Sequence, residues 1–290
     1  REITPIQYKQ FDWRVFLTAS TLLFSSFIGF DAIAQTGNEA KNPTKNIPRA
    51  ILLAIFIVSI YYILFTISVY NIVPWNFVAD ESLIKDITAP GLLSYVLPPF
   101  WGILIILGAT IALINDLPAM ILSVSRLMFA WSKDKIFPKK VSSIHEKYNT
   151  PHISIFVVGV VASIGSIGSH FAGDFFLGID IMVTSMMINF LLMCITVITI
   201  AKVNPKLYKE ITIFKNRTLQ KIIGYLGSVV IVIFLVIQTY TDLTSEVDAW
   251  YFHSTFIYLI VMTLASLYFL IRWIQIKRNN KHIFKSLPSE

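Results

Sequence analysis

Residues 22–48 read LLFSSFIGFDAIAQTGNEAKNPTKNIP, an apolar stretch that Gly29 and Asp31 interrupt and that an Asn-Pro loop closes. A bilayer core contains no water to satisfy the backbone groups that an interruption frees. Such a break is tolerated only where protein covers it or where it lines a water-filled cavity. Broken helices of this kind build the substrate sites of many secondary transporters. The stretch therefore predicts a discontinuous membrane helix with a binding site at its break.

The chain as a whole has the composition of a membrane protein. Hydrophobic residues make up 55% of it and charged residues 14%, whereas an average soluble domain has about 25% charged residues. A helix needs about 20 largely apolar residues to cross the hydrocarbon core. We therefore expect an all-α integral membrane protein with seven transmembrane helices, the first of them discontinuous. The seven apolar runs are residues 15–37, 49–73, 98–124, 152–169, 175–201, 222–241 and 251–274.

The net charge of +7 reflects membrane topology and not a nucleic-acid surface. If the first helix starts outside, only Arg1, Lys9, Arg14 and Lys85 of the 24 basic residues fall outside, and the other 20 fall in inner segments. Positive-inside sorting accounts for such an asymmetry. We therefore expect a multi-pass protein of the cell membrane with a cytoplasmic C-terminus and no nucleic-acid partner.

Catalytic and metal motifs do not appear in the sequence. Cys194 is the only cysteine, which excludes a disulfide framework and a thiolate metal cluster. There is no nucleophile–His–acid set, no phosphate-binding glycine loop and no metal-ligand spacing. We expect no enzyme activity, no metal and no resident cofactor. The chain begins with Arg1 and not with Met, so we expect it to be the later part of a longer protein.

Two motifs resemble those of the amino acid–polyamine–organocation (APC) superfamily. Residues 24–31 read FSSFIGFD, residues 39–43 read EAKNP, and Pro48 follows, which is similar to the sixth helix of that family. Residues 125–130 read SRLMFA and precede a Thr-Pro pair at residues 150–151. This second motif is similar to the end of the eighth helix and the loop into the ninth.

The sequence also departs from the family pattern. The acidic pair of the family is Asn38-Glu39 here, which weakens any argument for a gate of paired carboxylates. The common Asp-Gly of the inner loop is Asp134-Lys135.

The resemblance implies that the chain corresponds to helices six to twelve of an inverted-repeat (5+5+2) transporter fold. Helices one to five would then be missing from this chain and supplied by the same or a separate polypeptide. The implied segments are an outer leader at 1–14, the second five-helix repeat at 15–201, a cytoplasmic connection at 202–221, a final two-helix hairpin at 222–274 and a cytoplasmic tail at 275–290.

Gly29 is the predicted centre of the substrate site. Without a Cβ it permits backbone geometries that free the carbonyls of the preceding turn, which can then accept hydrogen bonds from a substrate ammonium. The alternative is that Gly29 only allows close helix packing. The neighbouring residues predicted to bind substrate are Ser25, Ser26, Phe27, Ile28 and Phe30; the apolar ones alternatively contact lipid or helices, and the serines alternatively bond their own preceding turn.

Asp31, Asn115 and Asp116 are the predicted proton- or ion-coupling residues. An acid within the membrane is a functional hypothesis by default. Asp31 can cap the second half-helix, or it can carry a proton because a carboxyl group shielded from water holds its proton more tightly. Asp116 lies ten residues before Arg126, about 15 Å along a helix and near the mid-membrane. Asn115 and Asp116 alternatively bond to a helix that is absent from this chain.

The resemblance implies secondary active transport of amino acids or related organic cations by alternating access, coupled to H⁺, Na⁺ or a counter-substrate. The alternative is a non-transporting seven-helix sensor or receptor derived from a permease. A retinal protein is disfavoured because residues 251–274 contain no lysine for a Schiff base. A channel is disfavoured because no filter-like re-entrant loop is present.

Overall fold

The computed structural model describes residues 12–35, 37, 40–82, 91, 93, 97–171, 177–209, 211, 214–245 and 252–279. Across these ranges every regular element is a helix, as the predicted all-α fold requires. Six of the described helices are long and apolar enough to cross a membrane. They are α3 (Pro43–Ile72), α6 (Pro99–Lys133), α7 (His152–Phe171), α8 (Leu177–Val203), α10 (Arg217–Thr244) and α11 (Ser254–Asn279).

The first predicted span, residues 15–37, is not one long helix. It is divided into α1 (Trp13–Ser25) and the short α2 (Ala32–Gln35), with turns at residues 26–31 between them. Six long continuous helices are therefore present in the described part of the chain, and the seventh, discontinuous crossing stays a prediction. The inverted-repeat relation stays a prediction.

The six long helices match the other predicted spans but differ from them at several ends; α3 begins six residues before the predicted start at 49, and α11 ends five residues after the predicted end at 274. α6 continues nine residues beyond the predicted end at 124, because a helix does not stop where its side chains become polar. α10 begins at Arg217, five residues before the predicted start at 222. Its start is fixed by Asn216, whose side-chain oxygen accepts hydrogen bonds from the backbone N–H groups of Thr218 and Leu219. Such N-caps satisfy donors that the first turn leaves free.

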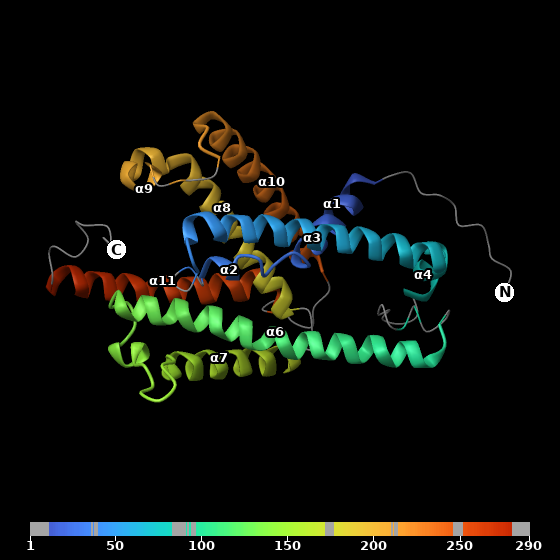
Figure 1. The fold of residues 1–290 in the computed structure, drawn as a ribbon, viewed down its shortest axis with the longest axis horizontal. Helices are drawn as coiled ribbons and strands as arrows, with labels where there is room; N and C mark the ends of the chain where they lie inside the picture. Colours follow the sequence, from blue (N-terminus) through green and yellow to red (C-terminus); the bar gives the residue numbers. More distant parts are fainter. Residues whose placement is uncertain are drawn as a thin grey trace.

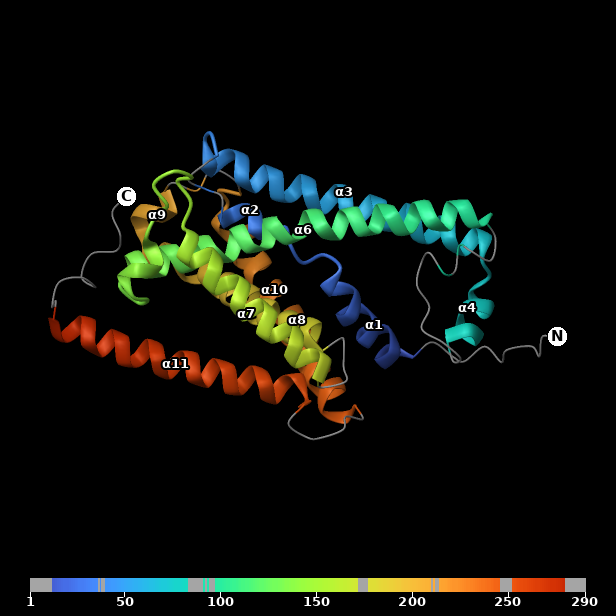
Figure 2. The same cartoon turned by 90° about the horizontal axis from the view of Figure 1, so that it is seen from below.

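The centre of the molecule is the packing of α10 along α8. Helix α1 contacts both of them, and α11 contacts α8. Figure 2 shows α7, α8 and α10 together in the middle, with α11 along one edge, whereas α3 and α6 extend beyond them. In the most apolar part of α3 and of α6 no residue is buried, so a membrane or further protein is needed to cover these apolar surfaces.

Polar contacts fix the connections at both ends of the long helices. The carboxylate of Asp242, near the end of α10, accepts hydrogen bonds of 2.9 Å from the N–H groups of Ser254 and Thr255 and so caps the start of α11. At the opposite end of α11, Arg272 donates to the carbonyls of Lys135 and Ile136, in the turn that follows α6. These contacts hold the final helix against the rest of the chain.

The remaining described elements are short. They are α4 (Trp75–Ser82), the 3₁₀ helix η2 (Lys139–Ser142) and α9 (Pro205–Lys209), and Figure 1 shows α9 beside the C-terminal end of α8. Several predicted segments lie outside the described residues: 1–11 of the leader, Asn38 and Glu39, most of 83–96 in the outer connection, and 280–290 of the tail.

Candidate functional site at the helix break

The break between α1 and α2 is centred on Gly29. Its φ of +127° is a backbone conformation that side chains with a Cβ rarely adopt, so glycine is required here for conformational reasons. A Cβ added to Gly29 would meet only Met120 Cε, at 3.7 Å, which is an ordinary contact. Conformation and not crowding therefore explains the glycine.

The break leaves both backbone N–H groups and backbone carbonyls without hydrogen-bond partners inside a helix. The N–H groups of residues 26–28 bond three residues back, to residues 23–25, and the carbonyls of residues 29–31 accept from residues 32–34. Among the described residues, no partner is recorded for the carbonyls of Phe27 and Ile28 or for the N–H groups of Gly29, Phe30 and Asp31. Unsatisfied backbone groups are costly within a membrane unless water or a ligand meets them. The break can therefore hold both an ammonium and a carboxylate group.

Tyr62 of α3 satisfies one of the freed carbonyls. Its hydroxyl donates to the carbonyl oxygen of Ser26 at 2.7 Å. Its ring also lies edge-on to Phe27, with the ring centroids 5.3 Å apart. α3 is thereby attached to the break directly.

Aromatic side chains form an apolar wall beside the break. Phe30 stacks on Phe190 of α8, with centroids 5.5 Å apart and an interplanar angle of 11°. Phe24 meets the edge of the same Phe190 ring at 5.9 Å and approaches Phe234 of α10 at 6.4 Å. The wall places the break against the packed pair α8 and α10.

One face of α6 approaches the break from another side. Met120 Cε lies 3.7 Å from the position that a Cβ on Gly29 would take, and the hydroxyl of Ser123 donates to the side-chain oxygen of Gln35 in α2. Residues three and four apart lie on one face of a helix. Asp116, four residues before Met120, therefore shares this face one turn further along. Asn115 is turned away from it by about 100°, because a turn contains 3.6 residues.

The predicted coupling carboxylates have different surroundings. Asp31 is half-buried at the end of the break, and Asp116 is exposed in the middle of α6. Neither carboxylate has a hydrogen bond or ion pair to any described residue. The structure thus brings Met120 and Ser123 of α6 to the break and to α2; Asp116 lies one turn further along the same face of α6, and Asn115 lies off that face.

A comparison with protein families identifies the chain. The model of the family described as "Amino acid permease" matches residues 8–285, which is nearly the entire chain. The chain belongs to the amino acid permease family. This match confirms the resemblance to the amino acid–polyamine–organocation superfamily, whereas the correspondence to its helices six to twelve stays a prediction.

Curated relatives of this permease chain are themselves named permeases or transporters. The branched-chain amino acid permease BcaP of Bacillus subtilis is 25% identical over 171 residues, which cover 56% of this chain and 36% of the relative. The low-affinity putrescine importer PlaP of Escherichia coli is 28% identical over 214 residues, 72% of this chain and 43% of the relative. The vacuolar cationic amino acid transporter 4 of Arabidopsis thaliana is 27% identical over 159 residues, covering 55% and 26% respectively.

The permease chain spans less than half the length of each of these relatives. No solved structure matches it significantly. The names of these relatives support transport in general, and none of the three is named as a sensor. Together with the six apolar helices, they make this a multi-pass membrane protein of a transporter family.

Sequence reasoning missed several residues around the break. Tyr62, Met120 and Phe190 come from three other helices, and only the rotation of each helix about its axis brings them to the break. Gln35 and Ser123 carried a weak signal, since both are polar residues in or beside apolar runs.

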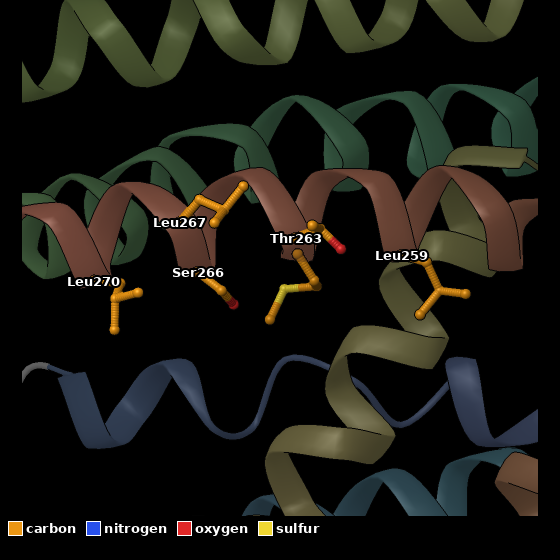
Figure 3. A pocket seen from close by; sticks show the side chains of 6 residues that line it. Leu259, Thr263, Ser266, Leu267 and Leu270 are labelled. Carbon is orange, nitrogen blue, oxygen red and sulfur yellow. The ribbon is translucent and has the colours of Figure 1, made fainter.

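Two other observations concern possible binding sites outside the break. Within the described ranges no group of three or more His, Cys, Asp or Glu residues is placed to hold a metal. The pocket of about 370 Å³ in Figure 3 lies on α11 and contains none of the predicted site residues. All its lining residues come from this one helix: Leu259, Met262, Thr263, Ser266, Leu267 and Leu270.

Proposed function

We propose that this chain takes part in the secondary active transport of amino acids or related organic cations and that the break at residues 26–31 binds the substrate. The observation that carries the proposal is that the carbonyls of Phe27 and Ile28 and the N–H groups of Gly29, Phe30 and Asp31 lie side by side with no hydrogen-bond partner among the described residues. A substrate ammonium would bond to the carbonyls. The names of the relatives, which include branched-chain amino acids, putrescine and cationic amino acids, support an amine-bearing substrate.

The site needs more protein than this chain supplies. The chain spans less than half the length of its relatives, and the apolar surfaces of α3 and α6 are uncovered. In our proposal, α1 and α2 together form one discontinuous membrane crossing, and additional helices close the site from the other side. Alternating access would rock these elements against the others. Phe24, Phe30 and Phe190 would contact the apolar part of the substrate.

The test is uptake by the complete protein, reconstituted in vesicles, with the substitution Gly29→Ala. Alanine at a φ of +127° costs about 1–3 kcal/mol or changes the geometry of the break. We expect uptake of radiolabelled amino acids and putrescine to fall by roughly tenfold or more, since 1.4 kcal/mol corresponds to a factor of ten. The matched control is Gly108→Ala, where an added Cβ meets no atom within 4 Å, and it should leave uptake unchanged.

Two results would contradict the proposal. Equal uptake by Gly29→Ala and Gly108→Ala would show that the break does not bind the substrate. Uptake by the present chain alone would show that no further helices are needed. In either experiment, the amount of folded protein in the vesicles is measured first.

A further inference from the structure

Two pockets lie side by side where α8 ends and α10 begins, away from the helix break. One has a volume of about 270 Å³ and the other about 190 Å³. Ile211 and Gln220 line both of them, so the two pockets share a wall. Their chemistry differs, which makes the pair a candidate site for an amphipathic ligand.

The larger pocket is apolar. It opens between the last turns of α8 and the first turns of α10, which are the ends of two apolar helices. Among the described residues that line it, only Gln220 and Thr196 are polar. The apolar lining residues are Val197, Ile200, Ile211, Phe214 and Ile223.

The smaller pocket is cationic. Lys209 at the end of α9 and Lys215 just before α10 both line it, together with Tyr208. Both lysines are exposed, and neither ammonium group has a partner among the residues that the structure describes. Residues 202–221 contain six basic residues and one acidic residue, Glu210, which lies outside the described residues. The pocket therefore lies in a strongly positive segment.

The wall between the pockets is held by a hydrogen-bond network. Arg217 donates to the carbonyls of Val197 and Ile198 of α8, and its guanidinium lies 5.4 Å from the centre of the Tyr208 ring. Gln220 donates to the carbonyl of Phe214, whose φ of 55° is left-handed. Arg217 thus positions the wall that the two pockets share, whereas Lys209 and Lys215 are available to bind a ligand.

We propose that this pair of pockets binds an anionic phospholipid, with an acyl chain in the apolar pocket and the headgroup phosphate between Lys209 and Lys215. Anionic headgroups are attracted electrostatically to lysine and arginine residues at the membrane surface. The site lies at the end of two membrane helices, where an acyl chain and a phosphate meet in a bilayer. A free phosphate would use only the cationic pocket.

The test is native mass spectrometry of the protein in detergent with equal amounts of phosphatidylglycerol and phosphatidylcholine. We expect the unmodified protein to retain phosphatidylglycerol preferentially. In the double variant Lys209→Gln, Lys215→Gln we expect the ratio of retained phosphatidylglycerol to phosphatidylcholine to fall by about tenfold, as expected for two surface lysines. The matched control is Lys139→Gln, Lys140→Gln in η2, which makes the same charge change in another basic loop and should retain the preference.

A third variant tests the acyl chain. Ile200→Trp fills the apolar pocket without changing the charge, and we expect it to reduce phosphatidylglycerol retention while thermal unfolding stays unchanged. Glycerol phosphate, which has the headgroup without acyl chains, should not displace the lipid. Suppose that glycerol phosphate displaces phosphatidylglycerol and that Ile200→Trp, whose thermal unfolding is unchanged, retains as much phosphatidylglycerol as the unmodified protein. The site then binds phosphate and not lipid. Equal losses in the two lysine pairs would show a general charge effect, and either result overturns the proposal.

Discussion

Asp31 and Asp116 belong to different elements of the structure. Asp31 ends the break itself, whereas Asp116 lies 17 residues from each end of α6, one turn from the Met120 that faces Gly29. The described residues supply no partner for either carboxylate. An intramembrane acid without a partner is expensive and is kept where it carries an ion or meets a charge. Both residues therefore remain candidates for coupling.

The two aspartates can be distinguished by pH. We expect Asp31→Asn in the complete protein to abolish the dependence of uptake on a proton gradient, because an amide cannot take up and release the proton. Asp116→Asn is the parallel variant, and Asn115→Ala, one residue away but off the face that meets Gly29, is the control. The measurement is uptake with and without an imposed proton gradient, repeated with a sodium gradient. An unchanged pH dependence in Asp31→Asn would leave Asp31 with no more than a capping role.

At the scale of single residues, the sequence predicts what depends on local backbone chemistry. Gly29 with Asp31 in an apolar run predicts a break, and the structure has turns at residues 26–31. The sequence did not predict that the Tyr62 hydroxyl bonds to the carbonyl of Ser26 or that the Phe190 ring stacks on that of Phe30. Those contacts depend on how each helix is rotated and packed, which no local pattern specifies.

At the scale of elements, small residues decide how closely α10 approaches α8. A Cβ added to Gly224 would lie 2.8 Å from Ile198 Cγ1 and 3.3 Å from the carbonyl oxygen of Cys194. A Cβ added to Gly227 would lie 3.0 Å from the sulfur of Cys194. Small residues at helix interfaces permit such close packing in membranes. This interface supports the wall of Phe190 and Phe234 beside the break.

Gly224→Ala should therefore destabilise the protein. Overpacking a filled interface costs about 1–3 kcal/mol, and each kcal/mol corresponds to about 2–4 °C in a domain of comparable size. We expect a lower midpoint of thermal unfolding in detergent. Gly108→Ala, on an open face of α6, should equal or exceed the unmodified protein, because alanine favours helix over glycine by up to about 1 kcal/mol. Equal midpoints for the two variants would contradict close packing at Gly224.

Helix positions were predicted well because length and hydropathy decide them, and six of the seven spans appear as long helices. The ends were predicted less well. α10 starts five residues early because of a single hydrogen-bonding side chain, Asn216, and α6 runs on through polar residues to Lys133. Capping and helix continuation depend on the residues of a single turn, whereas a long apolar run locates the helix without locating its end residues.

At the scale of the whole molecule, charge and helix order together predict an orientation. α6 separates the connection that contains α4 from η2, and α7 and α8 separate η2 from α9. If each of these helices crosses the membrane, η2 and α9 lie on one side and α4 lies on the other. Basic residues are concentrated in η2, in α9 and at the end of α11, and positive-inside sorting therefore predicts a cytoplasmic location for these segments.

Thiol labelling in intact cells tests this orientation. Cys194 is the only cysteine of this chain, so Cys194→Ser provides a background in which this chain carries no thiol. In that background we expect Ala79→Cys, on α4, to react with a membrane-impermeant maleimide in intact cells. Lys140→Cys on η2 and Lys206→Cys on α9 should react only after the membrane is permeabilised. Labelling of the cysteines at both lysine positions in intact cells would show that the topology is the reverse of the one predicted. Labelling of only one of them would mean that α7 and α8 do not both cross, and the packed pair α8 and α10 would then need a different relation to the bilayer.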